Sequence, residues 1–335
     1  MMTTTSREIR LASRPVGEPT PANFTLATTD LPAPGAGEVQ VKNRWMSVDP
    51  YMRGRMNDRK SYVPPFAIGE ALQGGAVGEV IASNDPGFAP GDLVNSMFGW
   101  REAFNAPAAA LTKLPSLPGV PEQAFLGVLG MPGLTAYAGL TRIGEPKSGD
   151  TLFVSGGAGA VGSVVAQVGK ALGCTVIATA GSDAKCDWLR SVGVDHAINY
   201  RSCGNLLAAV QAAAPRGIDI YFDNVGGEHL EVAIETARPF ARLVECGMIA
   251  DYNATSAIRG PSNIIQVVGK SLKIQGFIVT QFAGLQAEFI EKMAGWIADG
   301  RLKWEETVMD GIETAPAAFL ALFSGGNTGK MLVKL

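Results

Sequence analysis

A short strand, a glycine-rich turn and an amphipathic helix follow one another near the middle of the chain, and this order restricts the fold more than any other feature. Residues 151–155 (TLFVS) form a short apolar run, as expected of a strand buried on both faces. The glycine cluster 156–162 follows. The next apolar residues recur at helical spacing, at positions 161, 164, 165, 168 and 172. The pattern predicts a strand, a tight turn and a helix that ends near Gly173.

The alternation of strands and helices continues toward the C-terminus. Further strands are predicted at 175–180, 196–199, 219–223, 243–246 and 272–277. One helix is predicted to begin at about Asp183, and a second is predicted at 206–213. Such alternation over about 160 residues predicts a doubly wound parallel sheet and hence an α/β fold.

Residues 1–128 follow a different pattern, with short alternating stretches such as 38–42 and 78–81 between frequent Gly and Pro residues. This pattern predicts antiparallel β structure. The tail from about Ile312 predicts a short helix at 315–323 and a last strand at 330–335. We expect this strand to return to the first domain, so that the parallel sheet is an insertion.

Composition excludes several classes of function. The 28 basic and 31 acidic residues leave a net charge of −3, and no dense cluster of Lys and Arg suggests a nucleic-acid partner. No apolar run has the length of a membrane span, and the first residues lack the apolar core of a secretory signal. The four cysteines show no Cys-x-x-Cys spacing. We therefore expect a reduced, cytoplasmic, soluble protein without a membrane segment.

The motif Gly157-x-Gly159-x-x-Gly162 follows a predicted strand and opens a predicted helix, which is the context in which such a loop binds a dinucleotide. Glycines let the chain approach a pyrophosphate, whose charge is solvated by backbone N–H groups and the helix N-terminus. A turn that only lets strand and helix pack closely is the alternative.

The end of the second strand indicates which dinucleotide binds. An NAD site carries an acidic residue there, but the chain reads Ala180-Gly181-Ser182, and Ser182 or Asp183 is more simply a helix N-cap. Lys185 supplies a positive charge close to where a 2′-phosphate would lie. NADP(H) is therefore favoured over NAD(H), and a solvated helix charge is the alternative role of Lys185.

Segments along nearly the whole chain resemble those of a known family. They are VDPYMRGRM (48–56), MPGLTAY (131–137), GGAGAVGS (156–163), AGSDAK (180–185), INY (198–200), YFDNVGGE (221–228), ECGMIADYN (245–253) and GNTGK (326–330). The chain resembles the zinc-independent medium-chain dehydrogenases/reductases, in the branch of prostaglandin reductase (leukotriene B4 12-hydroxydehydrogenase), alkenal double-bond reductase and bacterial curcumin reductase. The resemblance implies a GroES-like catalytic domain at 1–128, completed by 313–335, a Rossmann NADP-binding domain at 129–312, and a homodimer.

The resemblance also implies the residues that contact NADPH. The pyrophosphate would contact Gly159, Ala160, Val161 and Gly162, and the 2′-phosphate would contact Lys185 and Tyr200. The rest of the dinucleotide would be lined by Asn224, Cys246, Gly247, Met248, Ile249, Tyr252, Phe277, Ile278, Val279 and Asn327. The segment 57–65 (NDRKSYVPP) resembles bacterial members more than mammalian prostaglandin reductases, which disfavours a prostaglandin as the natural substrate.

No metal is expected. Zinc-dependent alcohol dehydrogenases of the wider superfamily carry a Gly-His-Glu sequence where this chain reads Ile-Gly-Glu-Ala at 68–71. The two histidines, His196 and His229, are not at ligand spacing with cysteines and are interpreted as packing or surface residues. Without a Lewis acid, plain alcohol oxidation is disfavoured.

A tyrosine hydroxyl suits the reduction of an enone, because its pKa of about 10 keeps the proton available for a developing oxyanion. Tyr252 is the first candidate, since it follows a strand at the carboxyl end of the sheet and matches the proposed active-site tyrosine of the family. Tyr62 and Tyr51 come next, with packing as their alternative role. Water or the cofactor ribose could also supply the proton. Trp45, Met52, Met56, Phe98 and Met131 are interpreted as core more than as the lining of an apolar pocket.

These inferences lead to one functional hypothesis, an NADPH-dependent 2-alkenal/2-alkenone reductase that acts on small apolar enones and enals. A quinone oxidoreductase is the alternative within enzymes. A non-catalytic NADPH-binding protein is the alternative outside them, because fold alone does not establish function.

Overall fold

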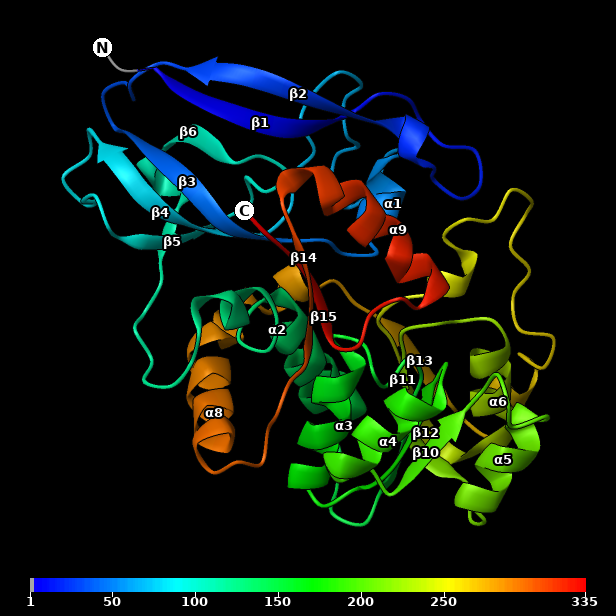
Figure 1. Ribbon diagram of the computed structural model, residues 1–335. Helices are drawn as coiled ribbons and strands as arrows, with labels where there is room; N and C mark the ends of the chain where they lie inside the picture. The colour runs from blue at the N-terminus through cyan, green and yellow to red at the C-terminus, as the bar shows by residue number, and fades with distance from the viewer. Residues whose placement is uncertain (1–2) are drawn as a thin grey trace. The chain divides into compact units, whose positions relative to one another are not determined.

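A computed structural model describes residues 3–335, so residues 1 and 2 of the first expected domain lie outside the described residues. The chain divides into two compact units (Figure 1). The first extends to Leu126 and includes Glu306–Asn327 and Met331–Leu335; the second comprises Gly127–Glu305 and Thr328–Lys330. The boundaries expected from the sequence were 128/129 and 312/313.

The first unit is built on antiparallel strands. β1 and β2 form a hairpin, and a larger sheet has the order β14-β15-β3-β4-β5-β7, with β6 paired to β3. The strands are β1 (Thr4–Leu11), β2 (Phe24–Leu31), β3 (Glu38–Ser47), β4 (Ala76–Ser83), β5 (Leu93–Ser96), β6 (Ala103–Pro107), β7 (Thr112–Lys113), β14 (Glu306–Asp310) and β15 (Lys330–Lys334). The helices are α1 (Met52–Arg55) and α9 (Ala315–Ser324).

The buried core of this unit accounts for the alternation of apolar and polar residues that the sequence shows. Val39 and Val41 alternate with polar residues along β3, and they pack with Val80 and Phe104 in one buried cluster. The last strand, β15, pairs with β3, so the C-terminal segment returns to this sheet as expected. No sequence pattern predicts β14, because it lies at the sheet edge and most of its residues are polar and only partly buried.

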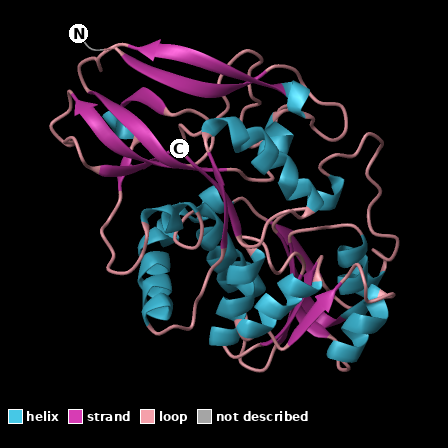
Figure 2. Cartoon of the chain, in the orientation of Figure 1, coloured by secondary structure: helices cyan, strands magenta, loops and turns pink. Residues whose placement is uncertain are grey.

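The second unit holds a parallel sheet in the order β10-β9-β8-β11-β12-β13. The strands are β8 (Thr151–Val154), β9 (Thr175–Ala180), β10 (His196–Asn199), β11 (Ile218–Asp223), β12 (Ala237–Glu245) and β13 (Lys273–Gly276). The helices are α2 (Met131–Ala138), α3 (Gly162–Ala171), α4 (Asp183–Ser191), α5 (Leu206–Ala213), α6 (Glu228–Thr236), α7 (Gln266–Gly269) and α8 (Gln286–Ala298). Figure 2 shows helices alternating with strands in this unit, whereas strands dominate the first.

The predicted fold class is confirmed, with an antiparallel domain of the GroES-like kind and a doubly wound Rossmann domain. The strand order reverses at β8, because β9 and β10 extend the sheet on one side and β11 lies on the other. Ligands of such sheets bind at this switch point, outside the carboxyl ends of the strands. Within residues 3–335, no helix is both long and apolar enough to cross a membrane.

Candidate functional site

The glycine loop connects β8 to α3 at the switch point and contains the predicted pyrophosphate residues Gly159, Ala160, Val161 and Gly162. A Cβ atom at Gly162 would lie 2.3 Å from the carbonyl oxygen of Gly156, so only glycine fits this turn. The N–H of Gly157 donates to the carbonyl of Thr179 at 2.8 Å, which holds the loop against β9. Since the first N–H groups of a helix have no intrahelical acceptor, the start of α3 can bind an anion.

The end of β9 leads into α4, and Ser182 is the N-cap of this helix, as the sequence favoured. Its hydroxyl accepts a hydrogen bond from the Lys185 N–H at 3.4 Å. Asp183, the residue that could have argued for NAD, accepts a hydrogen bond from the side chain of Asn199 at 2.7 Å. Both polar residues therefore have roles within the protein.

Lys185 lies near a second positive charge, that of Arg201 after β10. Burial and the charge of Arg201 both lower the pKa of Lys185 below its usual range. Tyr200 lies at the same corner, with its hydroxyl oxygen 3.0 Å from the position of a Cβ on Gly181 and its ring 5.8 Å from the Arg201 guanidinium. Two neighbouring cations and a phenol hydroxyl make a corner that attracts a phosphate.

The turn after β11 contains Asn224, another predicted cofactor residue. Its side-chain amide donates to the carbonyl oxygen of Ser155 at 2.8 Å, and its backbone N–H donates to the Ser155 hydroxyl at 2.8 Å. The neighbouring Asp223 is completely buried and accepts from the Ser155 hydroxyl at 2.8 Å. The ends of β8 and β11 are thus held together at the switch point.

A cavity of about 370 Å³ lies at the ends of β12 and β13. It is lined by Glu245, Cys246, Gly247, Met248, Gly276, Phe277, Ile278 and Gln281. The structure therefore brings the predicted residues at 246–248 together with Phe277 and Ile278. Ile249 and Val279 follow in short helical turns and do not line this cavity.

Tyr252 lies just beyond this segment, and its hydroxyl oxygen is 3.1 Å from the position that a Cβ on Gly247 would occupy. Its backbone N–H donates to Ile249 at 3.4 Å. The hydroxyl lies close above Gly247 because that residue has no side chain. Asn327 comes two residues before Gly329, whose N–H donates to the Ala158 carbonyl in the glycine loop at 2.8 Å.

Tyr51 and Tyr62 belong to the first unit, where Arg55 of α1 lies near both of them. Burial, followed by the charge of Asp49, raises the pKa of Tyr51, while a hydrogen bond from Arg55 opposes the shift. Tyr62 is 62% exposed and close enough to influence the ionisation of Tyr51 and Arg55. Arg55 is itself held by hydrogen bonds to Pro64 and Gln73, both 2.9 Å long.

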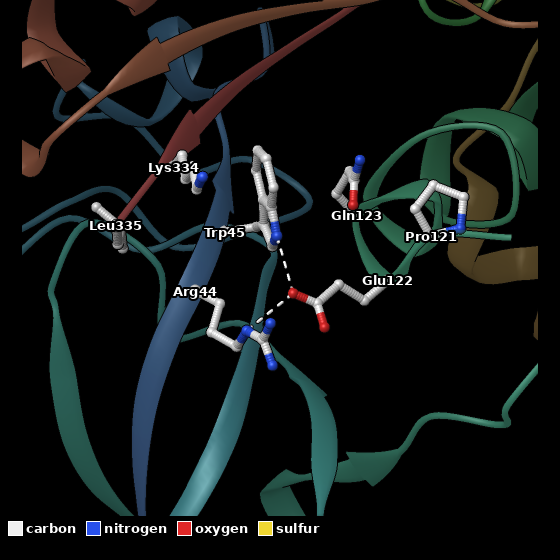
Figure 3. A pocket seen from close by; sticks show the side chains of 7 residues that line it. All are labelled: Arg44, Trp45, Pro121, Glu122, Gln123, Lys334 and Leu335. Carbon is white, nitrogen blue, oxygen red and sulfur yellow. Dashed lines mark hydrogen bonds and ion pairs between the residues drawn. The ribbon is translucent and has the colours of Figure 1, made fainter.

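Of the residues considered for an apolar pocket, Met52 and Met56 are buried in the core. Trp45 lines a different cavity, of about 400 Å³, in the first unit (Figure 3). Its indole N–H and the Arg44 guanidinium both approach the Glu122 carboxylate at 2.9 Å. These polar contacts satisfy the Glu122 charge within the protein.

Comparisons with known proteins agree with this architecture. The family model described as the N-terminal domain of oxidoreductase matches residues 7–114, and the model described as zinc-binding dehydrogenase matches residues 160–299. The NADPH-dependent curcumin reductase of Escherichia coli is 40% identical over 97% of this chain and 95% of its own. The 2-alkenal reductase (NADP(+)-dependent) of Nicotiana tabacum is 40% identical over 98% and 97%. CurA of Vibrio vulnificus, solved in complex with NADPH, is 42% identical, with a TM-score of 0.93 over 98% of both chains.

The chain belongs to the medium-chain dehydrogenase/reductase family. It is an oxidoreductase of the branch that the sequence resemblance indicated, which includes the curcumin and alkenal reductases. The chain and these relatives match over nearly their whole lengths, so both domains of the family are present.

The histidines of this medium-chain reductase lie in separate places. His196 is exposed, and His229 is buried against the ring of Tyr200, with ring centroids 5.2 Å apart. Burial lowers the pKa of His229 to about 4. In the part of the chain that the structure describes, no three His, Cys, Asp or Glu residues are grouped as metal ligands. Independence from zinc remains a prediction.

Sequence reasoning missed two basic residues of this reductase, Arg55 and Arg201. Arg201 directly follows Tyr200, so a basic residue beside a predicted phosphate contact was a signal that could have been used. Arg55 is the last residue of α1, whose N-cap is Tyr51, but its hydrogen bonds to residues 64 and 73 depend on the folded loop.

Proposed function

We propose that this reductase uses NADPH to reduce the carbon–carbon double bond of α,β-unsaturated aldehydes and ketones, as a 2-alkenal/2-alkenone reductase. The observation that carries the proposal is the pair of neighbouring cations, Lys185 in the first turn of α4 and Arg201 just after β10. Two adjacent positive charges favour a dinucleotide with an additional phosphate. The names of the curcumin and alkenal reductases support both the cofactor and the reaction.

The residues of the second unit fit NADPH. The turn at Gly162 has no space for a side chain, so a pyrophosphate can approach the start of α3. Lys185, Tyr200 and Arg201 would hold the 2′-phosphate, and the cavity beside Gly247 would take the nicotinamide end. When bound, NADPH supplies the hydride that is added to the β-carbon of the substrate.

Three tyrosines are the proposed catalytic residues. As negative charge develops on the carbonyl oxygen, the Tyr252 hydroxyl would donate a hydrogen bond to it. Tyr51 would remain protonated because burial raises its pKa. Tyr62 has an exposed ring that could contact an apolar substrate. Proton transfer to the α-carbon by a tyrosine, by the cofactor ribose or by water completes the reduction.

Oxidation of NADPH in the presence of an enone such as 3-nonen-2-one tests the proposal, with the saturated ketone as the expected product. No oxidation across a panel of enones and enals would reject it. A hydroquinone product from quinones alone would identify a quinone oxidoreductase instead, and tight NADPH binding without any turnover would identify a binding protein. Activity that survives exhaustive chelation, with no zinc found by elemental analysis, would support the metal-free reaction.

The assembly proposed for this reductase is a homodimer, in the reducing environment of the cytoplasm. β13 is at the end of the parallel sheet, and the segment before it exposes Ile264, Ile265 and Val268. A second copy of the chain could cover these apolar residues while pairing with the strand edge. Light scattering should give twice the chain mass, and the substitution Val268→Glu should shift the population toward monomer; a monomeric wild-type protein would refute the assembly.

A further inference from the structure

Two acidic residues end adjacent strands at the carboxyl edge of the parallel sheet, where the dinucleotide is predicted to bind; this predicted binding region is called the cofactor crevice below. Asp223 of β11 and Glu245 of β12 are opposite each other in the register of the parallel sheet. Asp223 Oδ1 accepts hydrogen bonds of 2.7–2.8 Å from the Ser155 and Tyr221 hydroxyls and from the N–H groups of Val225 and Gly226. Within residues 3–335, Asp223 Oδ2 and both carboxyl oxygens of Glu245 are buried and receive no hydrogen bond from any other residue.

Buried carboxylate oxygens without donors are unfavourable, and a single proton shared by the two acids removes most of the cost. Glu245 is the acid that holds this proton, because neither of its carboxyl oxygens has a donor, whereas Asp223 Oδ1 accepts four hydrogen bonds. Burial and the charge of Asp223 raise the pKa of Glu245 to about 8. A neutral Glu245 carboxyl can donate a hydrogen bond to the Asp223 carboxylate, and this side-chain interaction also contributes to its raised pKa.

We propose that neutral Glu245 is a positioning residue for the cofactor crevice, and that its ionisation loosens the segments that Asp223 holds. The carbonyl oxygen of Asp223 accepts hydrogen bonds from Cys246 and Gly247, both 3.0 Å long, while its carboxylate anchors the turn that begins at Asn224. Both segments carry predicted cofactor contacts. The inference rests on the proposed use of NADPH.

Ionised Glu245 would place two negative charges side by side in a buried site, and they repel each other strongly there. The segments on either side of Asp223 would then move apart. The dinucleotide is itself an anion, so the added charge would also oppose its binding directly. The affinity for NADPH is therefore expected to fall as Glu245 loses its proton.

Other titratable groups face this pair but do not titrate between pH 7 and 9. Burial raises the pKa of Tyr221 on β11 well above its usual value, and raises that of Cys246, after β12, to about 12. His229 of α6 faces Asp223 with its pKa lowered to about 4. On β13, the residue opposite Glu245 is Gly276, which carries no charge.

Loss of the Lys185 proton is a separate reason for weaker NADPH binding at alkaline pH, since the pKa of Lys185 is also lowered. The variants Glu245→Gln and Glu245→Leu keep Lys185 and therefore isolate the effect of Glu245. The glutamine amide can donate to Asp223 Oδ2 at every pH, whereas leucine cannot donate at any pH.

The test measures the dissociation constant of NADPH by nicotinamide fluorescence between pH 7 and pH 9.5. If only protein with neutral Glu245 binds NADPH, the affinity of the wild type for NADPH should be about tenfold weaker at pH 9 than at pH 7. Glu245→Gln should keep only the loss that Lys185 causes, and Glu245→Leu should bind more weakly than Glu245→Gln at pH 7. Parallel curves for the wild type and Glu245→Gln would overturn the proposal.

Unfolding of the cofactor-free protein by urea gives a second readout that does not depend on the proposed function. Between pH 5 and 8, the wild type should lose stability relative to Glu245→Gln, because only its folded state retains the extra proton. An equal pH dependence of the unfolding free energy in the wild type and Glu245→Gln would refute the shared proton, even if the enzyme reduces enones. Failure to bind NADPH at pH 7 would instead reject the proposed function, and the crevice role with it, while the unfolding curves would still report the proton.

Discussion

Replacing Gly247 with Ala should slow turnover because the added methyl group displaces the Tyr252 hydroxyl, and not because it fills the cavity. The added Cβ would lie 3.1 Å from the Tyr252 hydroxyl oxygen, so the hydroxyl must move by a few tenths of an ångström. A misplacement of about 1 Å costs about 100-fold in rate. On the same scale, this shift should lower kcat about fourfold, or ~0.8 kcal/mol.

The role of the hydroxyl itself is measured by Tyr252→Phe. Fully buried oxyanion donors contribute about 10²–10³ in kcat, and Tyr252 is partly exposed. We therefore expect a loss of about tenfold, or ~1.4 kcal/mol. In the double variant the clash partner is gone, so Gly247→Ala should cause no further loss, and the two effects should not add.

Steady-state kcat on one enone, at saturating NADPH, for the wild type, both single variants and the double variant gives this cycle. Gly276→Ala is the matched control, because a Cβ there lies in the same cavity but 3.9 Å from its nearest neighbour, the Glu245 carbonyl oxygen. An equal loss from Gly247→Ala with Tyr or Phe at position 252 would refute the steric argument. Unchanged kcat in Tyr252→Phe would refute a role of the hydroxyl.

Three further predictions concern the cofactor and the fold. Lys185→Ala and Arg201→Ala should each raise the KM for NADPH about tenfold while changing the KM for NADH less than about twofold, since charged hydrogen bonds contribute about 1.5 kcal/mol or more; equal effects on the two cofactors in steady-state assays would contradict a 2′-phosphate site. Gly162→Ala should lower the free energy of unfolding by about 2 kcal/mol, and more than Gly159→Ala, whose Cβ would lie 3.3 Å from the nearest atom; urea unfolding compares them. Below about pH 4.5, Glu245 is protonated in both the folded and the unfolded protein. Between that pH and its raised pKa of about 8, the free energy of unfolding of the wild type should fall by at most about 1.4 kcal/mol per pH unit. Urea titrations of Glu245→Gln should lack this slope.

The elements that the sequence predicted are those whose signals are local. The helical spacing after Gly162 predicted α3, and Gly173 ends it with a positive φ of 85°. Ser182 was identified as a possible N-cap from its place before a helix. In contrast, β14 has few buried apolar residues and is recognisable only through its pairing with β15.

The parts of the candidate site that the sequence did not predict depend on contacts between separate segments. Arg55 is fixed by the carbonyl of Pro64 and the side chain of Gln73, which no helical or strand pattern indicates. Glu245 ends a strand like any half-buried polar residue, and its unusual state follows only from the position of Asp223 on the next strand. Pair interactions of this kind require the sheet order, which the linear pattern leaves open.

The two halves of the proposed reaction differ in how strongly the fold constrains them. Binding of the pyrophosphate relies on backbone geometry, and a Cβ at Gly162 would overlap a carbonyl oxygen that the fold cannot move without shifting the loop. The substrate side relies on tyrosine side chains, and Tyr62, which is 62% exposed, contributes little to packing. Substitution at Tyr62 therefore costs the fold little, whereas substitution at Gly162 damages it. A chain of this architecture can change its substrate while keeping its cofactor, which is why glycine spacing indicates the cofactor class and does not indicate which enone is reduced.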